Sequence, residues 1–328
     1  MLGIFSNQLR YNIIFFSLFN LIYVTQASAK EKNLPQLIRF KMATISVTNI
    51  EETQDLYKKW LYYNTVERGY IPKNLAESWG AEKTANQPYI IMQPESKDDV
   101  FIRLIKVNSS QKYKANTTWG WNAIEIISKN PDDLYKNFIN SPFKILGKPE
   151  ALNNYPSIKA MQVQGVQQDV IYLTTETGNY KKSPLPKPKS SVGRIFIMVV
   201  AGPDINKLQN WYSEKFNLQK KQINNSPVAL INRAQGIPLN SSRPITTLNL
   251  AEHGNLLELD EYGSNTGPRM QNIGDLPPGI SITSITVKNL NDLDLDFITQ
   301  PINNYGTRTA TVIGPAGELL ELIEEKKR

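Results

Sequence analysis

The chain has 328 residues, of which 40% are hydrophobic and 20% are charged, and it contains one histidine and no cysteine. This composition is typical of a folded protein of about two domains, and it excludes a disulfide framework, a cysteine nucleophile and a cysteine-based metal site. The formal net charge is +7, but the lysines are scattered and form no basic stripe with interleaved aromatic residues, so we expect no nucleic-acid partner.

Residues 1–29 have the organisation of a secretory signal peptide. Arg10 is the only charged side chain before Lys30, and residues 13–22 form an apolar stretch that is too short to span a bilayer comfortably. Ala27-Ser28-Ala29 then supplies a small-x-small cleavage site. We expect cleavage after Ala29, a secreted or periplasmic location, and no stable membrane insertion of the mature chain. An uncleaved membrane anchor is the alternative.

The first module of the mature chain is predicted to begin with an alternating strand over residues 37–47. Asn49 then has the position of a helix N-cap, with Glu52 three residues later in a capping-box arrangement. After an irregular stretch, two further strands are predicted over residues 88–92 and 100–105, joined by a turn.

The second module repeats this order. A strand over residues 119–127 is followed by Asn130-Pro131, a strong helix start with proline at the first helical position. Strands over residues 158–163 and 170–173 complete it. Residues 178–192 then have no apolar period and carry alternate prolines at 184, 186 and 188, which indicates an extended linker and a domain boundary.

Two more modules follow the linker. The third has a strand over residues 194–200, a helix that begins near Asp204, and strands over 244–250 and 256–259. The fourth opens with a strand over residues 280–287, Asn289 is expected to cap a helix that extends through Phe297, and a hairpin at Gly314 closes the chain. A strand, a helix and a short set of strands therefore recur four times.

The closing hairpin contains a phrase that recurs, degraded, in each module. Its last strand carries Glu321, and the matching positions upstream are Glu258, Tyr172 and Arg103. The phrase Gly-Pro-x-Gly-x-x-x-Glu-Leu at 314–322 and the strand-then-cap starts at 47–49, 127–130 and 287–289 resemble those of the vicinal oxygen chelate superfamily, which includes glyoxalases, bleomycin-resistance proteins and extradiol dioxygenases. The resemblance covers residues 37 to about 325.

That resemblance implies an α+β fold in which four βαβββ modules pair into two open, cup-shaped half-barrel domains. We expect consecutive modules to pair, so that residues 37–177 form the N-terminal domain and residues 193–328 form the C-terminal domain. Members of the superfamily also pair modules across subunits, so a homodimer is an alternative.

Enzymes of the superfamily hold a divalent metal at the floor of the cup through histidine and carboxylate ligands. The matching positions in this chain are Met42, Trp121, Arg194 and Ile282 on the first strands, and Arg103, Tyr172, Glu258 and Glu321 on the last strands. This set lacks imidazoles, so we expect no metal and no cofactor. His253 falls in a predicted turn and is interpreted as a turn residue.

The resemblance and these substitutions predict an exported protein that binds a small organic ligand, anionic or aromatic, without a metal. Arginine presents a bidentate fork to carboxylate or phosphate and stacks on aromatic rings. The predicted ligand-binding residues are Arg103, Trp121, Tyr172, Trp79 and Arg194, with Trp79 as a candidate lid.

Three alternatives stay open. Arg103 can instead pair with an internal acid such as Glu125, with the aromatic residues serving as core. The chain can be a glyoxalase-like lyase or isomerase in which Glu258 and Glu321 transfer protons, with or without a weakly held divalent metal. The third alternative is a structural role, with the cups filled by side chains.

Overall fold

The computed structural model describes residues 34–107, 113–152 and 155–326. The predicted signal peptide, residues 1–29, lies outside them. The chain divides into Met1–Pro35 and Gln36–Arg328, and every helix and strand named below belongs to the second unit. No helix among the described residues combines the length and the apolar composition that a membrane span requires.

The elements form four successive modules. The first comprises β1 (Leu37–Val47), α2 (Ile50–Leu61), β2 (Tyr63–Tyr70), α3 (Lys73–Ser78), η1 (Glu82–Thr84), β3 (Pro88–Pro94) and β4 (Phe101–Lys106). The second comprises β5 (Gly120–Ser128), α4 (Pro131–Phe138), β6 (Lys144–Leu152), β7 (Tyr155–Gln164) and β8 (Val170–Glu176). The third comprises β9 (Val192–Gly202), α5 (Ile205–Phe216), β10 (Asn224–Pro227), α6 (Ala229–Gln235), β11 (Ser242–Asn249) and β12 (Leu256–Glu261). The fourth comprises β13 (Gly279–Val287), η2 (Leu290–Asp292), β14 (Ile302–Asn304), β15 (Thr307–Ile313) and β16 (Leu319–Glu324).

Three helices begin at the residues that the sequence predicts. The side chains of Asn49, Asn130 and Asp204 each accept hydrogen bonds from backbone N–H groups in the first turn of α2, α4 and α5. The predicted helix of the fourth module is wrong. Asn289 caps only the single turn η2, because the residues that follow alternate between aspartate and apolar side chains, a period of two that suits no helix face.

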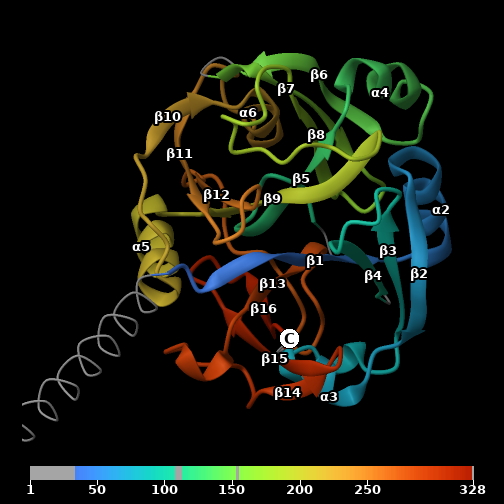
Figure 1. Ribbon diagram of the computed structural model, residues 1–328, viewed down its shortest axis with the longest axis vertical. Coiled ribbons are helices and arrows are strands. Elements are labelled where there is room, and N and C mark those ends of the chain that lie inside the picture. The colour runs from blue at the N-terminus through green and yellow to red at the C-terminus, as the bar shows by residue number, and fades with distance from the viewer. Residues whose placement is uncertain (1–33, 108–112, 153–154, 327–328) are drawn as a thin grey trace, which may run out of the picture. The chain divides into compact units, whose positions relative to one another are not determined.

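The sixteen strands of the described residues form two eight-stranded, strongly curled sheets (Figure 1). The first sheet has the order β14-β15-β16-β13-β1-β4-β3-β2, and the second has the order β10-β11-β12-β9-β5-β8-β7-β6. β1 runs antiparallel to β13, and β5 runs antiparallel to β9. The first sheet therefore joins the first and fourth modules, and the second sheet joins the second and third.

This pairing differs from the predicted division into residues 37–177 and 193–328. Residues 178–191 connect β8 to β9, which lie in the same sheet, so the proline-rich segment is not a boundary between two half-barrels. The reason is that all four modules offer a similar first-strand edge. The resemblance implies that modules pair, and the sequence repeat does not say which edges meet. Both sheets are completed within one chain.

Strand alternation assigns the two faces of each sheet to different environments. One face of both sheets packs with α2, α4 and α5 in a single large core, as Ile45, Leu104, Met198 and Leu257 illustrate. The opposite faces line two concave surfaces, which we call the first cup (modules one and four) and the second cup (modules two and three). Separate apolar clusters lie in the cups.

The repeated phrase has a structural role at two of its turns. Two turns immediately before β8 and β16 are closed by backbone hydrogen bonds. The N–H of Gly165 donates to the carbonyl oxygen of Asp169, and the N–H of Gly314 donates to that of Glu318. A helix tyrosine of the preceding module donates to each carboxyl group, Tyr57 to Asp169 at 2.5 Å and Tyr212 to Glu318 at 2.8 Å. These bonds connect the first module to the second and the third module to the fourth.

Candidate functional site

The floor of the first cup consists of β1, β4, β13 and β16. In the strand register Thr44 lies opposite Arg103 on one side and Ile282 on the other, and Ser284 lies opposite Glu321. Because these positions share the concave face, their side chains meet above the centre of the sheet.

Arg103 is only 1% exposed, and contacts from three directions hold it on this floor. Its Nε donates to Thr44 Oγ1 at 2.9 Å, one terminal nitrogen donates to the Tyr305 hydroxyl, and the other lies 3.3 Å from Glu321 Oε2. The guanidinium also stacks on the Trp79 ring, with 4.5 Å between its central carbon and the ring centroid. Burial lowers the pKa of Arg103, but Tyr305 and Glu321 outweigh it and raise the value, so the group stays charged.

Glu321 is fully buried and accepts hydrogen bonds from several neutral donors besides the arginine. Trp79 Nε1 donates to Oε1 at 2.8 Å, Ser284 donates to Oε2, and the Tyr305 hydroxyl lies 3.5 Å from Oε1. A buried ion pair is favourable only when its remaining lone pairs are satisfied in this way. The result is a rigid network in which the position of the guanidinium is fixed.

Tyr305 reaches the network from the hairpin between β14 and β15. Tyr305 and Gly306 form the two-residue loop and have φ values of 55° and 70°, as a type I′ turn requires. A tyrosine in the left-handed region is strained, and such strain persists where the surroundings fix it. Here the hydroxyl is fixed by Arg103 and Glu321, and burial raises its pKa well above the ordinary range, so it remains a neutral phenol.

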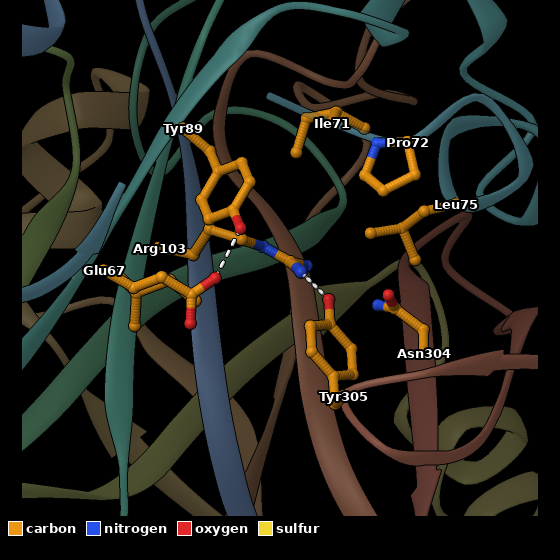
Figure 2. Close-up of a pocket in the computed structure, with 9 residues that line it drawn as sticks. Glu67, Ile71, Pro72, Leu75, Tyr89, Arg103, Asn304 and Tyr305 are labelled. Atoms are coloured by element: carbon orange, nitrogen blue, oxygen red, sulfur yellow. Dashed lines mark hydrogen bonds between the residues drawn. The ribbon is translucent and has the colours of Figure 1, made fainter. Parts of the chain in front are cut away.

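A cavity of about 170 Å³ lies next to this network. Figure 2 shows the Arg103 side chain extending across it from the strand toward Tyr305. The cavity is lined by Glu67, Ile71, Pro72, Leu75, Tyr89, Ile91, Arg103, Asn304 and Tyr305. One wall is therefore apolar, and the donors lie on the floor and on the β14–β15 hairpin.

Two polar groups of the lining stand out. The Tyr89 hydroxyl donates to Glu67 at the exposed rim, and burial together with that bond raises the pKa of Tyr89 to about 12. The side-chain nitrogen of Asn304 is buried and has no hydrogen-bond partner among the described residues. An unpaired buried amide is unfavourable, so Asn304 offers a donor to whatever occupies the cavity.

The structure brings together only two of the five predicted ligand-binding residues, Arg103 and Trp79. Trp79 is the C-cap of α3 and is buried beneath the guanidinium, so it serves as a platform and not as a lid. Trp121 faces the central core, where its indole nitrogen donates to the carbonyl oxygen of Leu319 at 2.8 Å. A bulge in β5 beside Trp121 reverses the expected alternation, which explains the error.

The other two predicted ligand-binding residues lie away from the first cup. Tyr172 lies on β8 in the second cup. Arg194 lies near the start of β9 and donates to backbone carbonyls and to Asn255 Oδ1. His253 occupies the adjoining turn, with Nε2 3.0 Å from the carbonyl oxygen of Ser183.

The predicted proton-transfer pair is separated by the module pairing. Glu321 lies on β16 in the first sheet, and Glu258 lies on β12 in the second, so the two carboxylates do not share a cup. Glu125 is also in the second sheet, and the acid that pairs with Arg103 is Glu321. An acid–base mechanism that uses Glu258 and Glu321 on one ligand is therefore excluded.

Solved structures share this architecture at low sequence identity. Glyoxalase I from Zea mays aligns with a TM-score of 0.58 and 14% identity, over 87% of this chain and 92% of that chain. A putative dioxygenase from Bacillus subtilis aligns with a TM-score of 0.59 and 8% identity, over 89% of this chain and 87% of that chain. The chain has the vicinal oxygen chelate fold. No family model matches the sequence, and no curated protein matches it. Identities this low establish the fold and leave the activity open.

The first cup does not fit the divalent metal that enzymes with the vicinal oxygen chelate fold hold. The four matching positions carry Met42, Ile282, Arg103 and Glu321, so only one carboxylate is present and a guanidinium lies 3.3 Å from it. A cation at this point would be repelled by Arg103. Across the described residues, no group of three or more histidine, aspartate and glutamate side chains is arranged to hold a metal ion.

Sequence reasoning missed most of the cavity. Glu67, Tyr89, Asn304 and Tyr305 come from strands and a hairpin that carry no recurring motif. The Asn-Tyr-Gly sequence at 304–306 is the one usable signal, because a glycine at the second loop position favours a type I′ hairpin. Nothing in that signal indicates that the tyrosine hydroxyl reaches an arginine about 200 residues earlier.

Proposed function

We propose that the protein binds a small organic anion in the first cup without a metal. The carboxylate of the ligand lies against Arg103 and Asn304, and the apolar or aromatic body of the ligand lies against Ile71, Leu75 and Ile91. The observation that carries this proposal is a cavity that combines an immobilised guanidinium with an unpartnered amide donor.

The charge on Arg103 favours an anion even though Glu321 is its neighbour. Guanidinium has five N–H donors, and the contacts to Thr44, Tyr305 and Glu321 engage three of them, one on each nitrogen. Glu321 also accepts hydrogen bonds from Trp79 and Ser284, so its negative charge is shared among several donors. A carboxylate in the cavity would complete the hydrogen bonding of both Arg103 and Asn304.

The size of the cavity restricts the ligand. Pockets for drug-sized molecules occupy about 300–1,000 Å³, and this one has about 170 Å³. A single-ring acid suits that volume, and a larger conjugate would require α3 or the β14–β15 hairpin to move.

Binding is tested with a matched probe series of benzoate, benzamide and benzyl alcohol, measured by calorimetry. We expect benzoate to bind at least about tenfold more tightly than the two neutral probes. Equal affinities for all three, or no binding of benzoate, would contradict the proposal.

Two pairs of variants locate the site. Leu75→Trp fills the cavity and is expected to abolish benzoate binding, whereas Asn74→Trp introduces the same ring at an exposed position of α3 and leaves it unchanged. Asn304→Asp replaces the free donor by a negative charge, and Asn303→Asp adds the same charge on an exposed neighbour. If both members of either pair behave alike, the ligand lies elsewhere.

Export belongs to the same proposal. The organisation of residues 1–29 supports a cleaved signal peptide, which would deliver the mature protein to the periplasm or to the exterior of the cell. Amino-terminal sequencing of protein recovered from the extracytoplasmic fraction is expected to begin at Lys30. Full-length protein in the cytoplasm, or an intact segment retained in the membrane, would refute this part.

A further inference from the structure

The second cup has the same strand register as the first, so the molecule contains its own comparison. Glu125 lies opposite Tyr172 across β5 and β8, as Thr44 lies opposite Arg103 across β1 and β4. Tyr172 therefore occupies the place of Arg103, and Glu125 occupies the place of Thr44.

The second half of each cup matches in the same way. Val199 on β9 lies opposite Glu258 on β12, as Ser284 on β13 lies opposite Glu321 on β16. The glutamate on the last strand is thus present in both cups. In the second cup Tyr172 replaces the arginine that pairs with it, and Glu125 places an extra carboxylate at the position of Thr44.

Asp260 adds a third carboxylate to the second cup. It follows Glu258 by two residues on β12, so it shares the concave face. Asp260 is 1% exposed, and neither of its carboxylate oxygens has a hydrogen-bond partner among the described residues. A buried carboxyl group in this condition is strongly unfavourable, so Asp260 offers two acceptor oxygens to a donor that enters the cup.

The positive charge of Arg243 lowers the pKa of Asp260, but Arg243 donates no hydrogen bond to it. Its terminal nitrogens donate to Asn232 and Gln235 of α6, its central carbon lies 5.4 Å from the Tyr262 ring centroid, and its Nε has no partner among the described residues. The arginine is therefore fixed by the helix and leaves both oxygens of Asp260 unbonded.

Two residues on the floor of the second cup are more exposed than their equivalents in the first. Glu258 and Tyr172 keep part of their surface accessible, although they lie on central strands. The equivalent Glu321 and Arg103 are 0% and 1% exposed. Glu258 and Tyr172 are therefore less buried than the residues at the matching positions of the first cup.

The three carboxyl groups affect one another. Burial and the neighbouring Asp260 raise the pKa of Glu125 to about 7, even though Thr174 donates a hydrogen bond to it. Burial raises the pKa of Asp260 to about 7, and burial with repulsion from Asp260 and Glu125 raises that of Glu258. A positive charge placed among these groups would relieve the repulsion and release protons.

We propose that the second cup binds a small organic cation, an ammonium or guanidinium group held by Glu258 and Asp260 against the ring of Tyr172. Carboxylates supply the charge, and aromatic faces supply cation–π attraction. Among the described residues, no three histidine, aspartate or glutamate side chains are arranged to hold a metal ion. This site is separate from the first cup and does not depend on the function proposed there.

The test uses choline and benzylamine, with their neutral isosteres 3,3-dimethylbutanol and benzyl alcohol, on the full chain. We expect at least one cation to bind about tenfold or more tightly than its neutral isostere, and its affinity to rise between about pH 6 and pH 8 as the carboxyl groups lose protons. Calorimetry in two buffers of different ionisation enthalpy should show proton release on binding. Equal binding of the neutral probes, or no binding of either cation, would overturn the proposal.

Variants then place the site. Asp260→Asn and, independently, Tyr172→Arg are expected to reduce cation affinity at least about tenfold, the second because it recreates the charge of the first cup. Glu150→Gln removes an exposed acid of β6 in the same sheet and should leave affinity unchanged. Circular dichroism verifies that each variant is folded, and the two substitutions act by different means, so failure of one to fold leaves the other as the test. Retained binding in a folded variant, or a stabilising response to Mg²⁺ or Zn²⁺ in place of the organic cations, would overturn it.

Discussion

Replacing Arg103 with methionine should destabilise the protein far more than its single ion pair suggests. The substitution keeps an unbranched apolar stem but removes the guanidinium and its positive charge beside Glu321, which is 0% exposed. Removing one partner of a buried pair typically costs about 3–5 kcal/mol, because the other charge stays buried without compensation. Trp79 and Ser284 still donate to Glu321, so we expect a value near the lower end of that range.

The assay is a double-mutant cycle by urea denaturation with Arg103→Met, Glu321→Gln and the double variant. Because Glu321→Gln removes the negative charge that Arg103→Met leaves uncompensated, the double variant should lose less stability than the sum of the single losses, by about 1–3 kcal/mol. Arg68→Met is the control. Arg68 pairs with Glu51 at 2.9 Å, but both side chains are largely exposed, so the loss should stay below about 1 kcal/mol.

Two results would refute this reasoning. Arg103→Met could be as mild as the Arg68 control, or the losses of the two single variants could simply add. Either result would mean that the neutral donors alone stabilise the buried Glu321 carboxylate. Arg103 would then bind a ligand without contributing to the stability of the fold.

Three further outcomes are expected. Burial raises the pKa of Glu318 to about 7 and that of Asp169 to about 6, so the folded state holds protons that the unfolded chain releases near pH 4. The free energy of unfolding by urea should therefore fall between about pH 5 and pH 8, and Glu318→Gln should remove on the order of 2 kcal/mol of that fall. A stability that does not change with pH would contradict this expectation. Gly317 and Gly279 both have positive φ, but an added Cβ would meet nothing within 4 Å at Gly317 and would lie 2.5 Å from the Tyr113 ring at Gly279. In the same assay, alanine should lower the free energy of unfolding by about 1 kcal/mol at Gly317 and by at least about 1 kcal/mol more at Gly279. Equal losses would show that Tyr113 moves aside. Protein treated with EDTA and protein supplemented with Zn²⁺, Ni²⁺ or Mn²⁺ should melt at the same temperature by calorimetry, and a shift of several degrees would contradict binding without a metal.

Local patterns in the sequence predicted local structure well. Asn49, Asn130 and Asp204 cap helices because their side chains satisfy N–H groups two or three residues away, an interaction that is complete within one turn. The closing phrase recurs as a turn and last strand because its glycine and acidic positions close the same backbone bond at residues 165–169 and 314–318. The helix predicted after Asn289 is wrong for an equally local reason, because the capping residue is followed by a pattern of period two.

The site was only partly within reach of the sequence. Arg103 and Trp79 were identified because one stands where the repeat has glutamate and the other is a large aromatic residue in an irregular segment. Their partner Glu321 was assigned to a different cup, since the sequence offered no reason to join the first module to the fourth. Tyr172 and Glu258 were placed in different cups for the same reason, although they share one.

The sequence alone determined that four similar modules exist, because strand period, caps and residue identity are properties of short segments. The resemblance to the vicinal oxygen chelate superfamily added that the modules pair into half-barrels and that the matching positions lack imidazole ligands. Only the tertiary structure decided which modules share a sheet, and with it that one cup pairs an arginine with a glutamate while the other collects three acids. The choice depends on which of several equivalent strand edges meet, with β1 finding β13 and β5 finding β9. Such long-range pairing leaves no mark within either partner's own residues, because each edge satisfies its backbone hydrogen bonds equally well with any strand of matching pattern.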